Sequence, residues 1–329
     1  MTVQFPTPTP TLQTKMRSRV RNLLTHSAAV AHRLGLRRRP NRLTHLSIDD
    51  MPPSLFAAPG RPTISVCVLT RNCAGTVTAT LTVLAELRAA GLIDDVVVID
   101  ADSPDGTARI AAGHGARIVS ESSLLPEFGP VLGKGDAMWR AQAVLTGEIV
   151  VFQDGDLADY AARHVLGVAG ALLRYPWLRF AKGTYRRHLR TDTDTIRDGG
   201  GRVSRLMARP LLKALYPDLH AFSQPLSGEV AITRELLGAL PMVTGYGVET
   251  GMLIDVYRRV GLGAMAEIDL RERANNHQSL TALEGMAEVV AQTVLSRAAA
   301  EGRIAGSVPA PTERPPFATV GVRQHSLIA

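Results

Sequence analysis

Residues 148–156 read EIVVFQDGD, and this stretch decides the fold that the rest of the chain is expected to adopt. The strongly apolar run 149–152 is typical of a buried strand. Asp154 ends the strand, and Gly155 permits the chain to turn. Because only one residue separates Asp154 from Asp156, both carboxylates are expected to reach the same space at the tip of the strand.

The sequence before this stretch repeats the strand pattern. Residues 63–69, 95–100 and 116–119 predict three further strands. Helices are expected between the strands, over 75–90, after the turn at 103–106, and over 135–145. Strands that alternate with helices predict a parallel, right-handed α/β sheet.

Polar side chains follow the ends of these strands. Asn72, Asp100, Asp102 and Asp154 all fall at the carboxyl ends, which is where ligands bind in such sheets. The placement itself indicates a binding site.

The second half of the chain is less regular and is expected to cover the sheet and carry an acceptor. Strands are expected over 178–185, 229–232 and 264–270, and helices over 202–215, 249–260 and 280–300. The expected divisions are a basic, partly disordered extension over 1–60, a nucleotide-binding α/β half over 61–160, an acceptor-binding half with a C-terminal helix over 161–300, and a flexible tail over 301–329.

The net charge of +7 belongs to the N-terminal extension. Residues 1–60 hold nine basic side chains against two acidic ones, so the rest is neutral and nucleic-acid binding by the body gains no support. A helix expected over 16–36 either packs on a protein surface, the favoured interpretation, or lies on an anionic membrane. No apolar run is long enough to span a bilayer, and Cys67 and Cys73 match neither a zinc site nor a disulfide framework, which favours the cytoplasm.

The two aspartates suit a divalent cation. Carboxylates together with diphosphate oxygens make a hard oxygen site of the kind that Mg²⁺ or Mn²⁺ occupies. Such a cation would stabilise a departing diphosphate. A solvated acidic turn is the competing interpretation of Asp154 and Asp156, and their position at a strand end favours the metal site.

Glycine-flanked cations supply two candidate anion sites. Lys134 stands between Gly133 and Gly135 at the start of a helix, and Arg202 follows three glycines, 199–201. Either segment could instead be a simple turn. Glu249 begins a helix behind a glycine-rich turn, where its carboxylate either grips sugar hydroxyls or complements the helix dipole.

Taken together, these stretches resemble the glucosyl-3-phosphoglycerate synthase family, retaining glycosyltransferases of GT-A fold. The resemblance spans 65–297 and is densest in the segments 133–140, 154–156, 185–187, 199–203, 208–212, 224–229 and 245–249. It implies transfer of a sugar from a nucleotide-sugar donor, with UDP or GDP as the carrier, to a small polar acceptor with retained anomeric configuration. It also implies a divalent metal and a homodimer.

The resemblance assigns roles position by position. It implies donor contacts from Thr70, Arg71, Asn72, Asp102, Lys134, Asp154, Gly155 and Glu249, and acceptor contacts from Gly201, Arg202, Val203, Tyr246, Arg273 and His277. It implies metal ligation by Asp156 and His277, with Asp156 and Glu249 as the catalytic positions.

The chain departs from the family pattern at both substrates. Cys73 and Ala74 replace two glutamates, and Asp102 replaces a glycine, which indicates an altered donor pocket and favours a guanine nucleotide. Asn275 stands where the family has its metal-binding histidine, with His277 two residues later, and Gln278 replaces an arginine that contacts the acceptor.

Three alternatives stay open. The chain could be a diverged relative in antibiotic or other secondary metabolism that glycosylates another small molecule or a thiol from a GDP-sugar. It could be a sugar nucleotidyltransferase, although the loop after the first strand holds only Gly75 instead of the glycine-rich loop of those enzymes. It could also bind nucleotide-sugars without catalysis.

Overall fold

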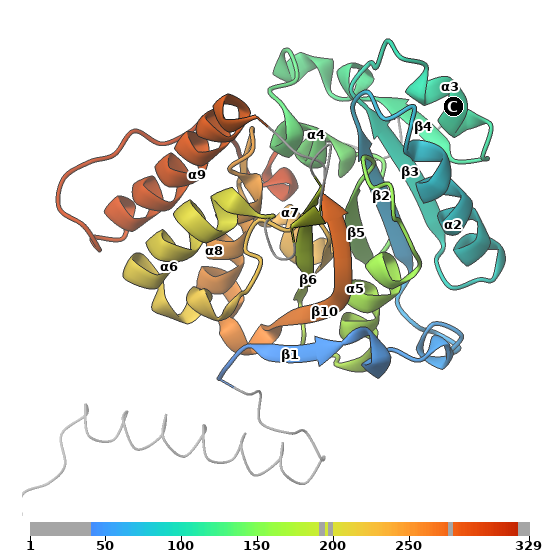
Figure 1. Ribbon diagram of the computed structural model, residues 1–329, viewed down its shortest axis with the longest axis horizontal. Coiled ribbons are helices and arrows are strands. Elements are labelled where there is room, and N and C mark those ends of the chain that lie inside the picture. The colour runs from blue at the N-terminus through green and yellow to red at the C-terminus, as the bar shows by residue number, and fades with distance from the viewer. Residues whose placement is uncertain (1–40, 191–194, 197–199, 276–278, 322–329) are drawn as a thin grey trace, which may run out of the picture. The chain divides into compact units, whose positions relative to one another are not determined.

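The computed structural model describes residues 41–190, 195–196, 200–275 and 279–321 (Figure 1). Its strands are β1 (Thr44–Ser47), β2 (Ile64–Thr70), β3 (Asp95–Asp100), β4 (Arg117–Ser120), β5 (Ile149–Asp154), β6 (Phe180–Arg190), β7 (Thr195–Ile196), β8 (Val230–Thr233), β9 (Met242–Val243), β10 (Met265–Asn275) and β11 (Glu313–Arg314). Its helices are α2 (Val77–Ala89), α3 (Thr107–Ala112), α4 (Lys134–Ala141), α5 (Arg163–Arg174), α6 (Arg209–Leu215), α7 (Arg234–Gly238), α8 (Val248–Val260) and α9 (Leu280–Ala300). A π-helical turn, Ser204–Ala208, leads into α6.

A mostly parallel sheet forms the centre of the fold, as the alternating pattern predicts. Its strand order is β1-β10-β6-β8-β5-β2-β3-β4. β5, β2, β3 and β4 run parallel to one another, so their carboxyl ends meet at one edge, which we call the donor edge. β8 is antiparallel to both of its neighbours and lies between β5 and β6. The second half of the chain therefore extends the same sheet.

Helices bury both faces of the sheet. Because successive side chains of a strand point to opposite sides, one strand contributes residues to both faces. On one face, Val66 and Val68 of β2 pack in a cluster with Leu84 of α2 and Val168 of α5. On the other face, apolar residues of β2, β3 and β5 pack in a cluster with Trp139 of α4 and with residues of α8 and α9. Figure 1 shows these helices on the two sides of the sheet.

Two parts of the chain differ from the sequence-based expectation. The sheet includes β1, which lies in the segment 1–60 expected to be a basic, partly disordered extension, and β1 pairs in parallel with β10. The expectation of a flexible tail over 301–329 is wrong for its central part, because β11 pairs with β9 and Trp139 Nε1 donates to the Pro315 carbonyl at 2.8 Å. The helix expected over 16–36 lies outside the described residues.

The described helices include none that is both long enough and apolar enough to cross a membrane.

Candidate functional site

The donor edge gathers the strand-end residues that the sequence predicts for a site. In the sheet register Thr70 lies opposite Asp100, and Leu69 lies opposite Asp154. The Gly155 amide donates to the Leu69 carbonyl at 2.9 Å, so the turn after β5 stays against the end of β2.

Position 155 requires glycine because there is no space for a side chain between the turn and the end of β2. A Cβ at this position would lie 2.6 Å from Thr70 Cγ2 and 2.9 Å from the Leu69 carbonyl oxygen. The glycine therefore allows the turn to approach β2 closely, and its role is steric, since its φ lies outside the left-handed region that favours glycine.

Buried Asp100 organises the loop that follows β2. Its carboxylate accepts from Thr70 Oγ1 at 2.8 Å and from the Ser103 amide at 2.8 Å. The Ser103 hydroxyl also donates to Asp100 and in turn accepts from the Asn72 amide at 2.9 Å. The Thr70 hydroxyl is thus engaged inside the protein, and Thr70 supports the loop instead of presenting its side chain to a donor.

This arrangement presents Asn72 and Asp102 to solvent with left-handed backbones. Their φ angles are 55° and 52°, a region that Asn and Asp adopt more readily than other side-chain-bearing residues. Arg71 is also exposed beside them. Such sparsely populated backbone conformations persist only where the surrounding structure holds them, and residues that adopt them cluster at binding sites.

Lys134 joins two carboxylates that lie far apart in the sequence. It is the first residue of α4, and its Nζ lies 2.6 Å from Asp154 Oδ1 and 2.7 Å from Glu249 Oε1. Burial alone would lower the pKa of Lys134, but Asp154 and Glu249 raise it well above its usual range. The lysine is therefore a fixed cation, and it brings together three of the residues expected to bind a donor.

Close packing holds the two helices that carry Lys134 and Glu249. A Cβ on Gly135 would lie 1.8 Å from the Val243 carbonyl oxygen and 2.9 Å from Val248 Cβ, so only glycine lets α4 approach the start of α8. Asp154 is confined in the same way, because a Cβ on Gly228 would lie 2.3 Å from its Oδ2.

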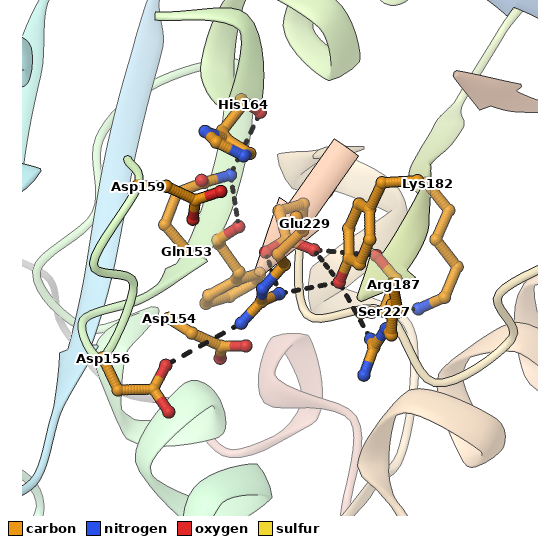
Figure 2. Close-up of polar contacts among 12 residues, drawn as sticks. Gln153, Asp154, Asp156, Asp159, His164, Lys182, Arg187, Ser227 and Glu229 are labelled. Atoms are coloured by element: carbon orange, nitrogen blue, oxygen red, sulfur yellow. Dashed lines mark hydrogen bonds and ion pairs between the residues drawn. The ribbon is translucent and has the colours of Figure 1, made fainter. Parts of the chain in front are cut away.

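A second polar cluster surrounds Glu229, which is fully buried (Figure 2). Arg273 Nη1 donates to Glu229 Oε1 and to the Tyr185 hydroxyl, both at 2.6 Å. The hydroxyls of Tyr185 and Ser227 each donate to Glu229 Oε2 at 2.9 Å. Burial would raise the pKa of Glu229, but Arg273 above all lowers it to about 2. Glu229 is therefore an anion at neutral pH, and donors from Arg273, Tyr185 and Ser227 hold its carboxylate.

Lys182 of β6 lies beside this cluster and was not singled out from the sequence. It is buried, and its Nζ donates to the Ser227 carbonyl at 2.5 Å (Figure 2). Burial lowers the pKa of Lys182 to about 8, although the carboxylate of Glu249 opposes that change. Lys182 thereby anchors the segment whose Gly228 confines Asp154. A lysine inside a predicted buried strand is the signal that could have identified it.

Asp156 connects the two clusters. Arg273 Nη2 lies 3.9 Å from Asp156 Oδ1 (Figure 2). Desolvation and then repulsion from Asp154 raise the pKa of Asp156. The Asp156 side chain is 70% exposed and is therefore accessible to a ligand. A cation bound beside Asp156 would relieve this repulsion.

The carboxylates at this site suit a metal ion that also takes oxygen ligands from a diphosphate. The part of the chain that the structure describes contains no ready-made group of three acidic, histidine or cysteine side chains around one point. Asp156 presents an exposed carboxylate next to Asp154, which suits Mg²⁺ or Mn²⁺ bound through one or two carboxylates and phosphate oxygens. The predicted ligand His277 lies outside the described residues.

Gly201, which is expected to contact the acceptor, lies beside Arg187, and Arg187 in turn contacts the Glu229 cluster. Gly201 has a φ of 71°, and a Cβ there would lie 3.3 Å from Arg187 Cδ. Arg187 Nη2 donates to the Tyr185 hydroxyl at 2.9 Å. Arg202 and Val203 follow directly along the chain. The predicted residue Tyr246 is 54% exposed and lies three positions before Glu249.

Comparison with known proteins places the chain among sugar-transferring enzymes. Residues 65–169 match the family model "Glycosyl transferase family 2". Glucosyl-3-phosphoglycerate synthase of Mycolicibacterium smegmatis is 42% identical over 243 residues, which cover 74% of this chain and 80% of that protein. The enzyme of the same name from Mycobacterium tuberculosis is 43% identical over 246 residues, covering 74% of this chain and 76% of that protein.

Solved structures agree with these matches. Mannosyl-3-phosphoglycerate synthase from Rubrobacter xylanophilus superposes with a TM-score of 0.77 at 38% identity and covers 84% of this chain and 97% of its own. Glucosyl-3-phosphoglycerate synthase from M. tuberculosis in complex with Mn²⁺, UDP-glucose and phosphoglyceric acid superposes with a TM-score of 0.70 at 37% identity, covering 84% and 98% of the two chains.

Proposed function

The chain belongs to the glucosyl-3-phosphoglycerate synthase family of glycosyltransferases with a GT-A fold, and from this premise we propose that it transfers a hexose from a nucleoside-diphosphate sugar to a small anionic acceptor such as phosphoglycerate. The observation that carries the proposal is the contact of Lys134 with both Asp154 and Glu249 at the donor edge. Both Asp154 and Glu249 are expected to contact the donor, and a fixed cation between them is suited to bind the donor's diphosphate.

The proposed metal site consists of Asp156 and the donor diphosphate. When bound, Mg²⁺ or Mn²⁺ would neutralise the charge that develops on the departing diphosphate. The M. tuberculosis relative binds Mn²⁺ together with UDP-glucose, which supports a divalent cation for this chain.

The residues of the chain would act mainly by positioning and charge. Lys134 would hold the diphosphate, and Glu249 would orient the sugar through its hydroxyls. No side chain is proposed as a nucleophile. The acceptor is proposed to attack from the face that the diphosphate leaves, so that the anomeric configuration is retained and the acceptor proton passes to the leaving phosphate.

The loop after β2 bears on whether the donor nucleotide is UDP or GDP. Cys73 is buried, and burial raises the pKa of its thiol to about 11, so this residue contributes no charged group to the donor pocket. The altered loop supports testing GDP-mannose beside UDP-glucose. A diverged relative that uses a GDP-sugar and another acceptor is the alternative that this comparison tests.

Backbone hydrogen bonds speak against a sugar nucleotidyltransferase. Such an enzyme needs free amides after the first strand to cradle a triphosphate. Here the amides of Asn72, Cys73 and Ala74 donate to Ser103, Thr107 and Asp105 at 2.9, 2.9 and 3.0 Å. The amides of the loop after β2 are therefore already bonded to side chains of the segment 103–107 and are not free to bind a triphosphate.

We also propose a homodimer, as the family resemblance implies, and a cytoplasmic location, which the two cysteines favour. Light scattering on the purified protein tests the dimer, and a monomer at assay concentration would contradict it.

The function is tested by incubating the protein with UDP-glucose or GDP-mannose, phosphoglycerate and either Mn²⁺ or Mg²⁺, with the product identified by mass spectrometry. Formation of a hexosyl-phosphoglycerate that is lost in Asp156→Asn and kept in Arg259→Gln supports the proposal; Arg259 is an exposed residue of α8. If well-folded protein binds neither nucleotide-sugar in calorimetry, the proposal is wrong.

A further inference from the structure

A buried lysine lies close to the donor edge, and the proposed mechanism gives it no part. Lys182 of β6 is 1% exposed, and its Nζ donates to the Ser227 carbonyl at 2.5 Å (Figure 2). We propose that Lys182 is a positioning residue, whose ammonium sets the affinity of the donor site by holding Ser227 and Gly228 in place. This inference rests on the proposed function, because it assumes that the donor edge binds a nucleotide-sugar.

Stability alone does not account for a lysine at this position. Burying an ammonium costs free energy, which one hydrogen bond to a neutral carbonyl only partly offsets. Phe180, two residues earlier on the same face of β6, and its register neighbour Met265 are both buried and apolar. A methionine at position 182 would fill the same space without a buried charge, and such replacements are often neutral or stabilising. The charge therefore points to a role in placing Ser227.

The segment that Lys182 holds packs against residues of the donor edge. A Cβ on Gly228, the residue after Ser227, would lie 2.3 Å from Asp154 Oδ2, so the backbone there lies close to the carboxylate. Asp154 Oδ1 in turn lies 2.6 Å from Lys134 Nζ. A shift of Ser227 would move the backbone that confines Asp154, and with it the cation proposed to hold the diphosphate.

The other end of the same segment is fixed from the neighbouring strand. Glu267 of β10 lies opposite Lys182 in the parallel register of the two strands. Its buried carboxylate accepts from the Ser223 amide at 2.6 Å, from the Ser223 hydroxyl at 2.9 Å and from the Gln224 amide at 3.3 Å. The Ser227 amide donates to the Gln224 carbonyl at 3.1 Å, which closes the turn between the two anchors. Because Glu267 holds the first end, loss of the second anchor would act at Ser227, next to the donor site.

The ammonium of Lys182 can lose its charge at moderately alkaline pH. Burial lowers the pKa of Lys182 to about 8. The charged groups that act on it from the surrounding elements are Glu249 of α8, Lys134 of α4, Glu229 before β8 and Asp154 of β5, and Glu267 lies opposite it on β10. A neutral amine is a weaker donor than an ammonium and adds no positive charge near a diphosphate. Donor affinity should therefore fall as the pH rises through about 8.

Calorimetry with Mg²⁺ and either UDP-glucose or GDP-mannose, at pH 7 and at about pH 8.5, tests the inference. In the wild type Kd should rise about fourfold between these pH values, because the protonated fraction of Lys182 falls. In Lys182→Met the Kd at pH 7 should be about tenfold higher than in the wild type and should no longer change with pH. Lys213→Met, at an exposed lysine of α6, should keep the Kd and the pH profile of the wild type.

The outcomes separate this inference from the proposed function. If the wild type binds neither nucleotide-sugar, the proposed function is wrong and this inference falls with it. If the wild type binds one of them and Lys182→Met has the same Kd and pH profile, only this inference is overturned. If urea unfolding shows that Lys182→Met does not fold, the wild-type profile decides. A wild-type Kd that is equal at the two pH values then overturns the role of Lys182, and a rise that Lys213→Met shares supports it.

Discussion

Replacing Arg273 by methionine should destabilise the protein strongly, because it leaves the fully buried Glu229 carboxylate without its cation. In the wild type Arg273 Nη1 lies 2.6 Å from Glu229 Oε1, and Arg273 is itself 8% exposed. Removing one partner of a buried ion pair costs about 3–5 kcal/mol, because the remaining charge stays desolvated. The free energy of unfolding of Arg273→Met at pH 7 should fall by about that amount.

The pH dependence gives this prediction its sign. In the wild type the pKa of Glu229 is lowered from 4.5 to about 2 in the folded state, so its contribution to stability is complete above about pH 4.5 and is lost as the pH falls toward 2. In Arg273→Met, burial is no longer opposed by Arg273 and raises the pKa of Glu229. As the pH falls, Glu229 therefore takes up a proton in the folded variant before it does so in the unfolded variant. The stability difference between the two proteins should therefore shrink as the pH falls from 7 to 4.5.

Urea unfolding at both pH values measures the difference, and Glu229→Gln provides the control. In the double variant Arg273→Met/Glu229→Gln the neutral amide oxygen can still accept from Tyr185 and Ser227. It should be more stable than Arg273→Met alone by about 2 kcal/mol, since no buried charge is left unpaired. A loss below about 1 kcal/mol at pH 7, or a difference that grows on acidification, would refute the assignment of Glu229 as a buried anion.

Three further predictions concern the donor edge and its support. Lys134→Met should lower kcat/KM at least about 100-fold, because Asp154 and Glu249 lose their shared cation; steady-state kinetics within threefold of the wild type would reduce Lys134 to a structural role. Gly228→Ala should weaken nucleotide-sugar binding about tenfold in calorimetry, since the new Cβ would meet Asp154 Oδ2 at 2.3 Å, while Gly285→Ala on α9, with nothing within 4 Å, should bind normally. Arg314→Ala should lower the free energy of unfolding by about 1.5–3 kcal/mol by removing its bonds of 2.8 and 2.7 Å to buried Asp136; the exposed pair of Arg186 and Glu272 should cost less than about 1 kcal/mol when Arg186 is replaced by alanine, and equal losses would contradict the distinction.

The parallel half of the sheet could be predicted because its signals are local. The strand over 95–100 and the helix over 280–300 have the predicted bounds, and the strand after residue 148 ends at Asp154 as expected. Short apolar runs between turn residues fix such strands, and their order follows from right-handed crossovers. The donor edge follows from that order alone.

The rest depends on contacts that no local pattern contains. The direction of β8 is not encoded in its four residues, which read equally well as a parallel strand. Helix α5, which contains two glycines, was not predicted. A Cβ on Gly167 would lie 2.4 Å from Leu270 Cδ2, so that glycine serves packing against β10. The link from Arg273 to Glu229 joins residues 44 positions apart. Prolines near residue 315 are typical of a flexible tail, yet they accompany the segment that packs on Trp139.

The late position of Arg314 has a consequence for synthesis on the ribosome. The segment that matches the glycosyltransferase family model, 65–169, leaves the ribosome early, and with it α4 and its buried Asp136. The guanidinium that completes the surroundings of Asp136 is made only 178 residues later. In a nascent chain the Asp136 carboxylate of α4 therefore stays incompletely paired until Arg314 has been added. Chaperone contact or proteolysis would be most effective in this state.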